Sequence, residues 1–281
     1  MGPSAFRLAD IHERLRELGY SVDDAGDVEV SIRETSEPGD PQLKYLNEIR
    51  HTCEKLRDKV QEILAAGRMP VVLGGDHSIA MGTIAGLSRF FAERREKIGL
   101  VWFDAHGDMN TAETTPSGNI HGMPLAVAMG LGVASLVELA GNRPMVEASR
   151  AAVVGLRDVD APERVNLKAT GIRAFTMRDI DERGMRAVME EAIQRAATGT
   201  AGIHVSFDLD GMDPDLAPGV GTPSPGGLSY REAHLAMEML ADTGKVVSAE
   251  LVEVNPILDH RNGTARLGVG LLASLLGKKI L

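Results

Sequence analysis

Three short stretches of this chain carry aspartates, and two of them also carry a histidine, in a pattern that suits a metal site. Alternate residues of an extended segment point the same way, so Asp104, His106 and Asp108 can face one point, as can Asp208 and Asp210. Four carboxylates held close together would repel one another unless cations neutralised them. We therefore predict that these side chains converge on metal ions. The stretches are Gly74-Gly75-Asp76-His77-Ser78, Asp104-Ala105-His106-Gly107-Asp108 and Asp208-Leu209-Asp210-Gly211.

The ligand types indicate which ions and which reaction to expect. Four aspartates and two histidines suffice for two ions. Mostly oxygen ligands with one imidazole per ion fit Mn(II) better than structural zinc, although zinc or cobalt could substitute. Paired ions lower the pKa of a bound water, so hydrolysis is the expected reaction. A lone Asp-x-Asp could instead be a cap or a buried polar group whose hydrogen bonds are satisfied. Asp76 is expected to orient its loop or a ligand, and Asp213 is ambiguous.

Each stretch follows an apolar run rich in β-branched residues. These runs alternate with helical patterns, which indicates a three-layer α/β/α fold with a mostly parallel sheet. Ligands of such sheets bind beyond the carboxyl ends of the strands. Apolar spacing predicts covering helices over residues 8–18, ending at Gly19, and over Gln42–Ala66, ending at Gly67. The predicted strands are Val28–Ile32, Pro70–Leu73, Ile98–Phe103, Ala151–Gly155, Ile172–Thr176, Ile203–Phe207 and Val246–Val254.

Length and composition limit the class of protein. No linker divides the 281 residues, so we expect one domain over residues 1–281. The net charge of -10 and the lack of a basic stripe argue against a nucleic-acid partner. We find no membrane-length apolar run and no secretory signal, and the one cysteine, Cys53, suits a buried position. We therefore expect a cytoplasmic protein that does not enter a membrane.

Four motifs together resemble a known family. They are GGDHSIA (74–80), DAHGDMNTAETTPSGNIHG (104–122), SFDLDGMDPDLAPGVGTPSPGGLSYRE (206–232) and EVNP (253–256), and they resemble the arginase branch of the ureohydrolases, especially bacterial arginases. The resemblance runs over essentially the whole chain. It implies an arginase-like fold, here apparently without the family's first N-terminal strand. It also implies a homotrimer or homohexamer.

By the same resemblance, the chain would hold two Mn(II) ions per subunit. Asp104 and Asp208 would bridge the ions, with His77 on one and His106 on the other. The implied reaction is hydrolysis of L-arginine to L-ornithine and urea by a metal-bridging hydroxide. The implied ligands are His77, Asp104, His106, Asp108, Asp208 and Asp210.

The resemblance also implies residues for the amino-acid end of the substrate. Asn110, Thr115 and Ser117 match the loop that contacts the α-carboxylate, and Asp160 matches the acid that meets the α-ammonium, with Glu163 as a further candidate. Such a site rejects analogues that lack the bonded groups, so agmatine should be a poor substrate. Alternatively, the three loop residues could brace their own loop, and Asp160 could cap a turn or helix.

Four residues are implied at the reacting end. Glu253 matches the acid that holds the guanidinium, and His121 matches the histidine that exchanges protons with solvent. Asp108 is a candidate proton carrier to the leaving amine, and Thr222 lies in a Gly/Pro-rich loop that could close over the site. The alternatives for Glu253 and His121 are a buried salt bridge and a core histidine.

Other readings stay open. The nearest is another ureohydrolase, acting on agmatine, a guanidino acid or formiminoglutamate. More distant are a metal-dependent deacetylase, against which the arginine-loop match argues, and a non-catalytic or regulatory homologue, against which the complete ligand set argues. Ser229 and Glu232 are interpreted as a helix capping box. The remaining histidines are expected at the surface or in the core: His12, His51, His204, His234 and His260.

Overall fold

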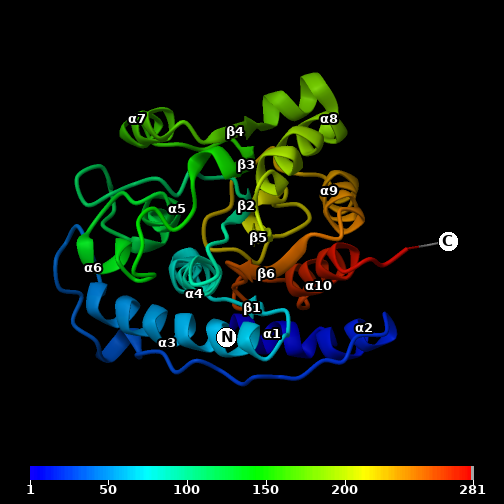
Figure 1. Ribbon diagram of the computed structural model, residues 1–281, viewed down its shortest axis with the longest axis horizontal. Coiled ribbons are helices and arrows are strands. Elements are labelled where there is room, and N and C mark those ends of the chain that lie inside the picture. The colour runs from blue at the N-terminus through cyan, green and yellow to red at the C-terminus, as the bar shows by residue number, and fades with distance from the viewer. Residues whose placement is uncertain (280–281) are drawn as a thin grey trace.

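The computed structural model describes residues 1–279, and a single sheet of six parallel strands lies at its centre (Figure 1). The strand order is β1-β6-β5-β2-β3-β4, so the sheet expected to be mostly parallel is entirely parallel. Strands β2, β3 and β5 are buried along their whole length, because helices cover both faces of the sheet. The strands are β1 (Val71–Leu73), β2 (Ile98–Phe103), β3 (Ala151–Leu156), β4 (Arg173–Thr176), β5 (Gly202–Asp208) and β6 (Val246–Val252).

Helices form a layer on each face, and each layer encloses its own apolar core (Figure 1). The core that contains Phe6, Phe207 and Leu272 lies under α1 (Gly2–Leu8), α2 (Ile11–Glu17), α8 (Met177–Ala197), α9 (Tyr230–Asp242) and α10 (Gly263–Leu275). The core that contains Ile84 and Trp102 lies under α3 (Leu46–Ala65), α4 (Ala80–Ala92), α5 (Pro124–Ala128), α6 (Ala134–Val137) and α7 (Ala161–Thr170).

One predicted strand is wrong. Residues Val28–Ile32 are irregular and pair with no strand among residues 1–279. They run past α3, where Glu29 lies 3.6 Å from the ammonium of Lys55. Val30 and Ile32 are 61% and 65% exposed. The β-branched residues favour an extended strand, but a strand also needs an adjacent strand to complete its backbone hydrogen bonds.

The predicted helix over residues 8–18 is interrupted. Helix α1 ends at Leu8 and α2 begins at Ile11, because Asp10 between them adopts a left-handed conformation with φ of 59°. Leu8 is consequently 77% exposed rather than part of the buried face, while Ile11 and Leu15 are buried as expected. The second predicted helix is confirmed as α3, although it begins at Leu46.

The strand order explains why distant stretches of sequence meet. Strands β1, β6, β5 and β2 are neighbours, and all run in the same direction, so their carboxyl ends share one edge of the sheet. The loop after β1 carries His77, the loop after β2 carries Asp104, and β5 ends at Asp208. Glu253 follows β6 directly. Asp160 follows β3, one strand further along.

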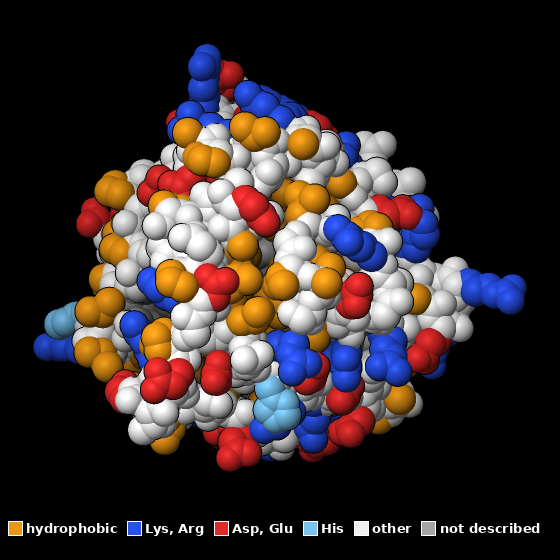
Figure 2. Space-filling model, turned by 90° about the vertical axis from the view of Figure 1, so that its left-hand side faces the viewer, with side chains coloured by type: hydrophobic (Ala, Val, Ile, Leu, Met, Phe, Trp, Pro, Cys, Tyr) orange, Lys and Arg blue, Asp and Glu red, His pale blue; other side chains and the backbone are white. Residues whose placement is uncertain are grey.

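Charged side chains of both signs are interspersed on the face shown in Figure 2, where apolar side chains gather across the middle. On α3, opposite charges pair along the helix, as for Arg50 with Glu54 and Lys59 with Glu62. Within residues 1–279, no helix combines the length and apolar character needed to cross a membrane.

Candidate active site

His77 occupies a buried turn between β1 and α4. Asp76 accepts a hydrogen bond from the backbone N–H of Ser78 at 3.0 Å and so begins a short 3-10 helix over His77–Ile79, which confirms that Asp76 orients its loop. The backbone N–H of His77 donates to Oε1 of Glu253 at 2.7 Å. The His77 side chain is 1% exposed, and these contacts direct its ring into the edge of the sheet.

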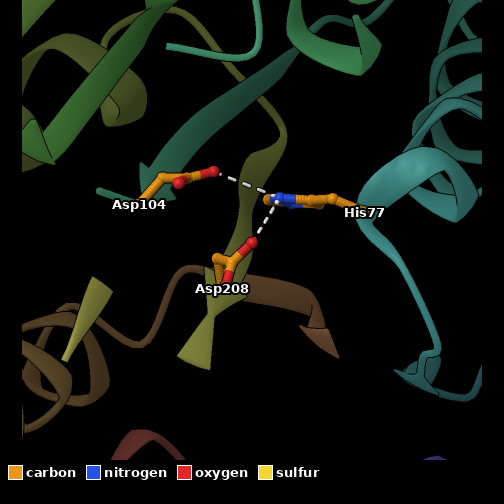
Figure 3. Close-up of side chains that lie close together, drawn as sticks. All are labelled: His77, Asp104 and Asp208. Atoms are coloured by element: carbon orange, nitrogen blue, oxygen red, sulfur yellow. Dashed lines mark ion pairs between the residues drawn. The ribbon is translucent and has the colours of Figure 1, made fainter. Parts of the chain in front are cut away.

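Three carboxylates surround one ring nitrogen of His77. Its Nδ1 lies 3.2 Å from Oδ2 of Asp104, 3.1 Å from Oδ2 of Asp108 and 3.1 Å from Oδ2 of Asp208. Figure 3 shows how His77, Asp104 and Asp208 point toward one another from three separate segments. One imidazole and several carboxylate oxygens at this spacing form a candidate metal site.

A second candidate site adjoins the first and shares a ligand with it. Nδ1 of His106 lies 3.4 Å from Oδ1 of Asp104 and 3.1 Å from Oδ2 of Asp210. The two oxygens of Asp104 thus face different histidines, as a bridging carboxylate would. Asp208, the other expected bridging residue, belongs to the group at His77.

The electrostatics of this cluster favour bound cations. Burial raises the pKa of Asp108 to about 7, and the charge of Asp104 adds to the rise. Burial and the charges of Asp210 and Asp104 raise the pKa of Asp208 well above its ordinary value. Nδ1 of His77 and Oδ2 of Asp108 are buried without a hydrogen-bond partner among residues 1–279. Crowded carboxylates with unpartnered lone pairs fit two divalent cations, which would offset the repulsion and use those lone pairs.

Trp102 is a contributor to the site that the sequence analysis missed. Its indole Nε1 donates to Oδ2 of Asp104 at 3.0 Å, and its ring stacks on His77. The backbone N–H of His106 donates to Oδ1 of Asp104 at 2.7 Å. Trp102 lies two residues before Asp104 on the same strand face, and it is the chain's one tryptophan, which is the signal that could have identified it.

His121 and Glu253 face each other beside the cluster of histidines and aspartates. Nδ1 of His121 lies 3.5 Å from Oε1 of Glu253, and this carboxylate raises the pKa of His121 to about 9 despite partial burial. Glu253 and Asp108 both have left-handed backbones, with φ of 65° and 51°. Non-glycine residues adopt this conformation at a cost, and such strain concentrates at functional sites.

A pocket lies next to the cluster of histidines and aspartates. It is lined by every site residue predicted from the sequence except Asp104, which is fully buried. Its walls come from the loops after β1, β2, β3, β5 and β6. The pocket is lined by His77, His106, Asp108, Asn110, Thr115, Pro116, Ser117, Asn119, His121, Gly122, Asp158, Asp160, Glu163, Asp208, Asp210, Thr222 and Glu253.

The loop after β2 supplies the polar rim of the pocket. Nδ2 of Asn110 donates to Oδ2 of Asp160 at 3.2 Å, which ties this loop to the start of α7. Thr115 Oγ1 accepts the backbone N–H of Gly118 at 2.9 Å. Ser117 Oγ accepts a backbone N–H two residues further on. The loop residues therefore brace their own loop and also line the pocket.

Asp160 and Glu163 lie at the first turn of α7, where Asp160 is the N-cap residue. Glu163 is buried, and its two carboxylate oxygens accept the backbone N–H groups of Met109 at 2.8 Å and Asp160 at 3.1 Å. Thr222 also lines the pocket, and its Oγ1 donates to Oδ2 of Asp210 at 2.9 Å. Glu163 and Thr222 thus fix the positions of neighbouring site residues.

The chain is similar in sequence and fold to known proteins. The Arginase family model matches residues 1–277. Arginase of Bacillus subtilis (strain 168) is 50% identical over 281 residues, covering 100% of this chain and 93% of that protein. Arginase from Bacillus caldovelox is 48% identical with a TM-score of 0.96, and arginase from Bacillus cereus is 49% identical with a TM-score of 0.94. Each of these two structural matches covers 100% of this chain and 93% of the other chain.

Proposed function

This chain belongs to the arginase family, and we propose that it hydrolyses L-arginine to L-ornithine and urea with the help of two Mn(II) ions. The observation that carries the proposal is the pair of imidazole–carboxylate groups that share Asp104 at the floor of a polar pocket. Predominantly oxygen ligands with one imidazole in each group suit manganese. The proposed ligands are His77, Asp104, His106, Asp108, Asp208 and Asp210.

Two Mn(II) ions held by these residues would lower the pKa of a bound water, so that hydroxide would be available near neutral pH. The protein's own part is to hold the guanidinium of arginine beside this position. Oε1 of Glu253 already accepts the N–H of His77, which leaves Oε2, on the side of Gly221, for the cation. A carboxylate fixed in this way can orient a planar guanidinium through charge-assisted hydrogen bonds.

The polar residues that the loop after β2 and the start of α7 contribute to the pocket suit the α-amino and α-carboxylate groups. Asp160 offers a carboxylate to the ammonium, while Asn110, Thr115 and Ser117 offer amide and hydroxyl groups to the carboxylate. Glu163 also lines the pocket, and its hydrogen bonds to the backbone of Met109 and Asp160 would hold these two segments in position. A substrate without the α-carboxylate would leave these polar groups unpaired, so arginine should be preferred to agmatine.

Proton transfer is assigned to two side chains. His121 lies at the side of the pocket with 30% of its side chain exposed, so it can exchange protons between the site and solvent. Asp108 lies within the cluster, where it can carry a proton to the leaving amine. Thr222 would hold Asp210 in place through its hydrogen bond.

The test is urea release from L-arginine and from agmatine, by the enzyme stripped of metal and then resupplied with Mn(II). We expect activity with arginine that depends on manganese, and much weaker activity with agmatine. The His121→Ala and Glu253→Gln variants should both lose most of the turnover. Intact turnover in both variants would contradict the mechanism, and a preference for agmatine would indicate another ureohydrolase.

A further inference from the structure

Four polar residues form a buried block beneath the metal cluster. His204 and Ser206 alternate on β5, and Ser248 and Glu250 alternate on β6. The strands place His204 beside Ser248 and Ser206 beside Glu250, so all four side chains lie on one face of the sheet. Each of the four residues is 0% exposed. Burying polar side chains inside a sheet costs free energy unless their hydrogen bonds are satisfied, so the presence of four such residues together suggests a specific role.

Within the block, Glu250 and His204 form an incompletely satisfied pair. Nε2 of His204 lies 3.3 Å from Oε1 of Glu250, and Nδ1 of His204 lies 2.7 Å from Oγ of Ser248. Neither carboxylate oxygen of Glu250 has a hydrogen bond of good geometry among residues 1–279. Against the effect of burial, His204 holds the pKa of Glu250 below its ordinary value. The block thus presents a buried carboxylate with capacity for a further donor.

Ser206 contacts His77 and is paired with Glu250 across the strands. Nε2 of His77 lies 2.8 Å from Oγ of Ser206, while the other ring nitrogen faces the three aspartates of the metal cluster. A histidine whose Nδ1 lone pair binds a metal carries its proton on Nε2, so Nε2–H donates to Ser206. The hydroxyl proton of Ser206 is then free for an acceptor, and its neighbour across the strands is Glu250.

We propose that Glu250, paired with His204, is a positioning residue that acts through Ser206 to fix the orientation and the tautomer of His77. A carboxylate behind a ligating histidine holds the ring in place and makes the ligand more basic. Among residues 1–279, His106 has no buried carboxylate behind it: its side chain is 27% exposed, and Asp158, whose Oδ2 lies 4.0 Å from its Nε2, is 68% exposed. The effect of Glu250 should therefore be confined to the ion at His77.

The inference rests on the proposed binuclear manganese site, and the test is Mn(II) titration of the metal-free protein by calorimetry, followed by electron paramagnetic resonance. For Glu250→Gln we expect one of the two sites to weaken by about 10- to 100-fold while the other keeps its affinity. At limiting Mn(II), the spectrum should shift from a coupled pair toward a single isolated ion. Ser206→Ala should weaken the same site, because it removes the connection but keeps the Glu250–His204 pair.

Ser274→Ala is the matched control. Ser274 bonds to a buried histidine, His234, at 2.8 Å, between α9 and α10 and outside the pocket. This variant should bind both ions as the wild type does. Unchanged affinity of both sites in Glu250→Gln and Ser206→Ala would overturn the inference, and if Glu250→Gln fails to fold, Ser206→Ala alone decides. Failure of the wild type to bind two Mn(II) ions would instead contradict the proposed function.

Discussion

The indole of Trp102 lies flat against the imidazole of His77, with ring centroids 4.0 Å apart and planes 10° from parallel. The same indole donates a buried hydrogen bond to Asp104, so one side chain supports two proposed ligands. Trp102→Phe keeps an aromatic ring for stacking but removes the donor. Loss of a buried hydrogen bond to a carboxylate should lower the free energy of unfolding by about 1–3 kcal/mol.

Urea unfolding of the metal-free Trp102→Phe protein, followed by circular dichroism, measures this loss. The far-UV signal is the suitable probe, because the variant has no tryptophan left to fluoresce. A free energy of unfolding equal to that of the wild type would mean that the indole N–H contributes nothing beyond packing.

Arg157 joins the end of β3 to the long connection between β5 and α9. Its guanidinium donates to the backbone carbonyl of Gly155 and to those of Asp210, Gly211, Met212 and Ser224. Lysine offers a point charge instead of a planar fork and cannot reach all of these acceptors. Arg157→Lys should therefore lower the free energy of unfolding by about 1–3 kcal/mol, measured by urea titration.

Arg178→Lys is the control, because it replaces an arginine by a lysine at a position without such hydrogen bonds to the backbone. Arg178 forms an exposed pair with Glu182 one helical turn away, and such pairs contribute little. The free energy of unfolding of Arg178→Lys should differ from that of the wild type by no more than about 0.5 kcal/mol. If both variants lost the same free energy of unfolding, the hydrogen bonds of Arg157 to these backbone carbonyls would not stabilise the fold more than an exposed pair does.

The carboxylate of Glu253 should control the protonation of His121. In the metal-free protein the pKa of His121 is raised to about 9 by Glu253, against the effect of burial. Because the folded-state pKa exceeds the unfolded one, this pair stabilises the fold fully below the ordinary value of 6.5, and its contribution is lost as the pH rises to about 9. In Glu253→Gln the pKa should fall toward 6.5 or below, because burial then acts without the carboxylate.

Nuclear magnetic resonance of labelled histidines gives this pKa directly, with His121→Ala identifying the signal. The signal of His51, which lies on the exposed surface of α3 and outside the pocket, is an internal reference. A His121 titration that stays near 9 in Glu253→Gln would place the source of the raised pKa elsewhere.

The convergence of histidine and aspartate side chains could be predicted because the carboxyl ends of parallel strands share one edge. His77, Asp104 and Asp208 could therefore be assigned to one place without any coordinates. The strand expected over Val28–Ile32 failed for a related reason, since β-propensity describes the residues of a strand and not the presence of a neighbour.

Supporting contacts were harder to predict. Glu163 was expected at the substrate, and the structure shows its carboxylate bonded to the backbone of Met109, 54 residues earlier in the chain. His204 was expected to be structural and is buried, yet its partner Glu250 comes from another strand. Such contacts depend on strand register and loop paths, which a single sequence does not contain. The available signal was the polar alternation within the apolar strands β5 and β6.

Asp160 offers the clearest test of how the amino-acid end of the substrate is recognised. Asn is as good an N-cap as Asp, so Asp160→Asn should preserve α7 while it removes the negative charge. A hydrogen bond to a charged group contributes about 1.5–3 kcal/mol, so kcat/KM for L-arginine should fall by roughly 10- to 100-fold, mainly through KM. The control substrate is 5-guanidinopentanoate, which is arginine without its α-amino group. Its turnover should be almost unaffected by Asp160→Asn, because there is no ammonium to pair with. A parallel fall for both substrates would show that Asp160 acts by shaping the pocket instead of binding the ammonium.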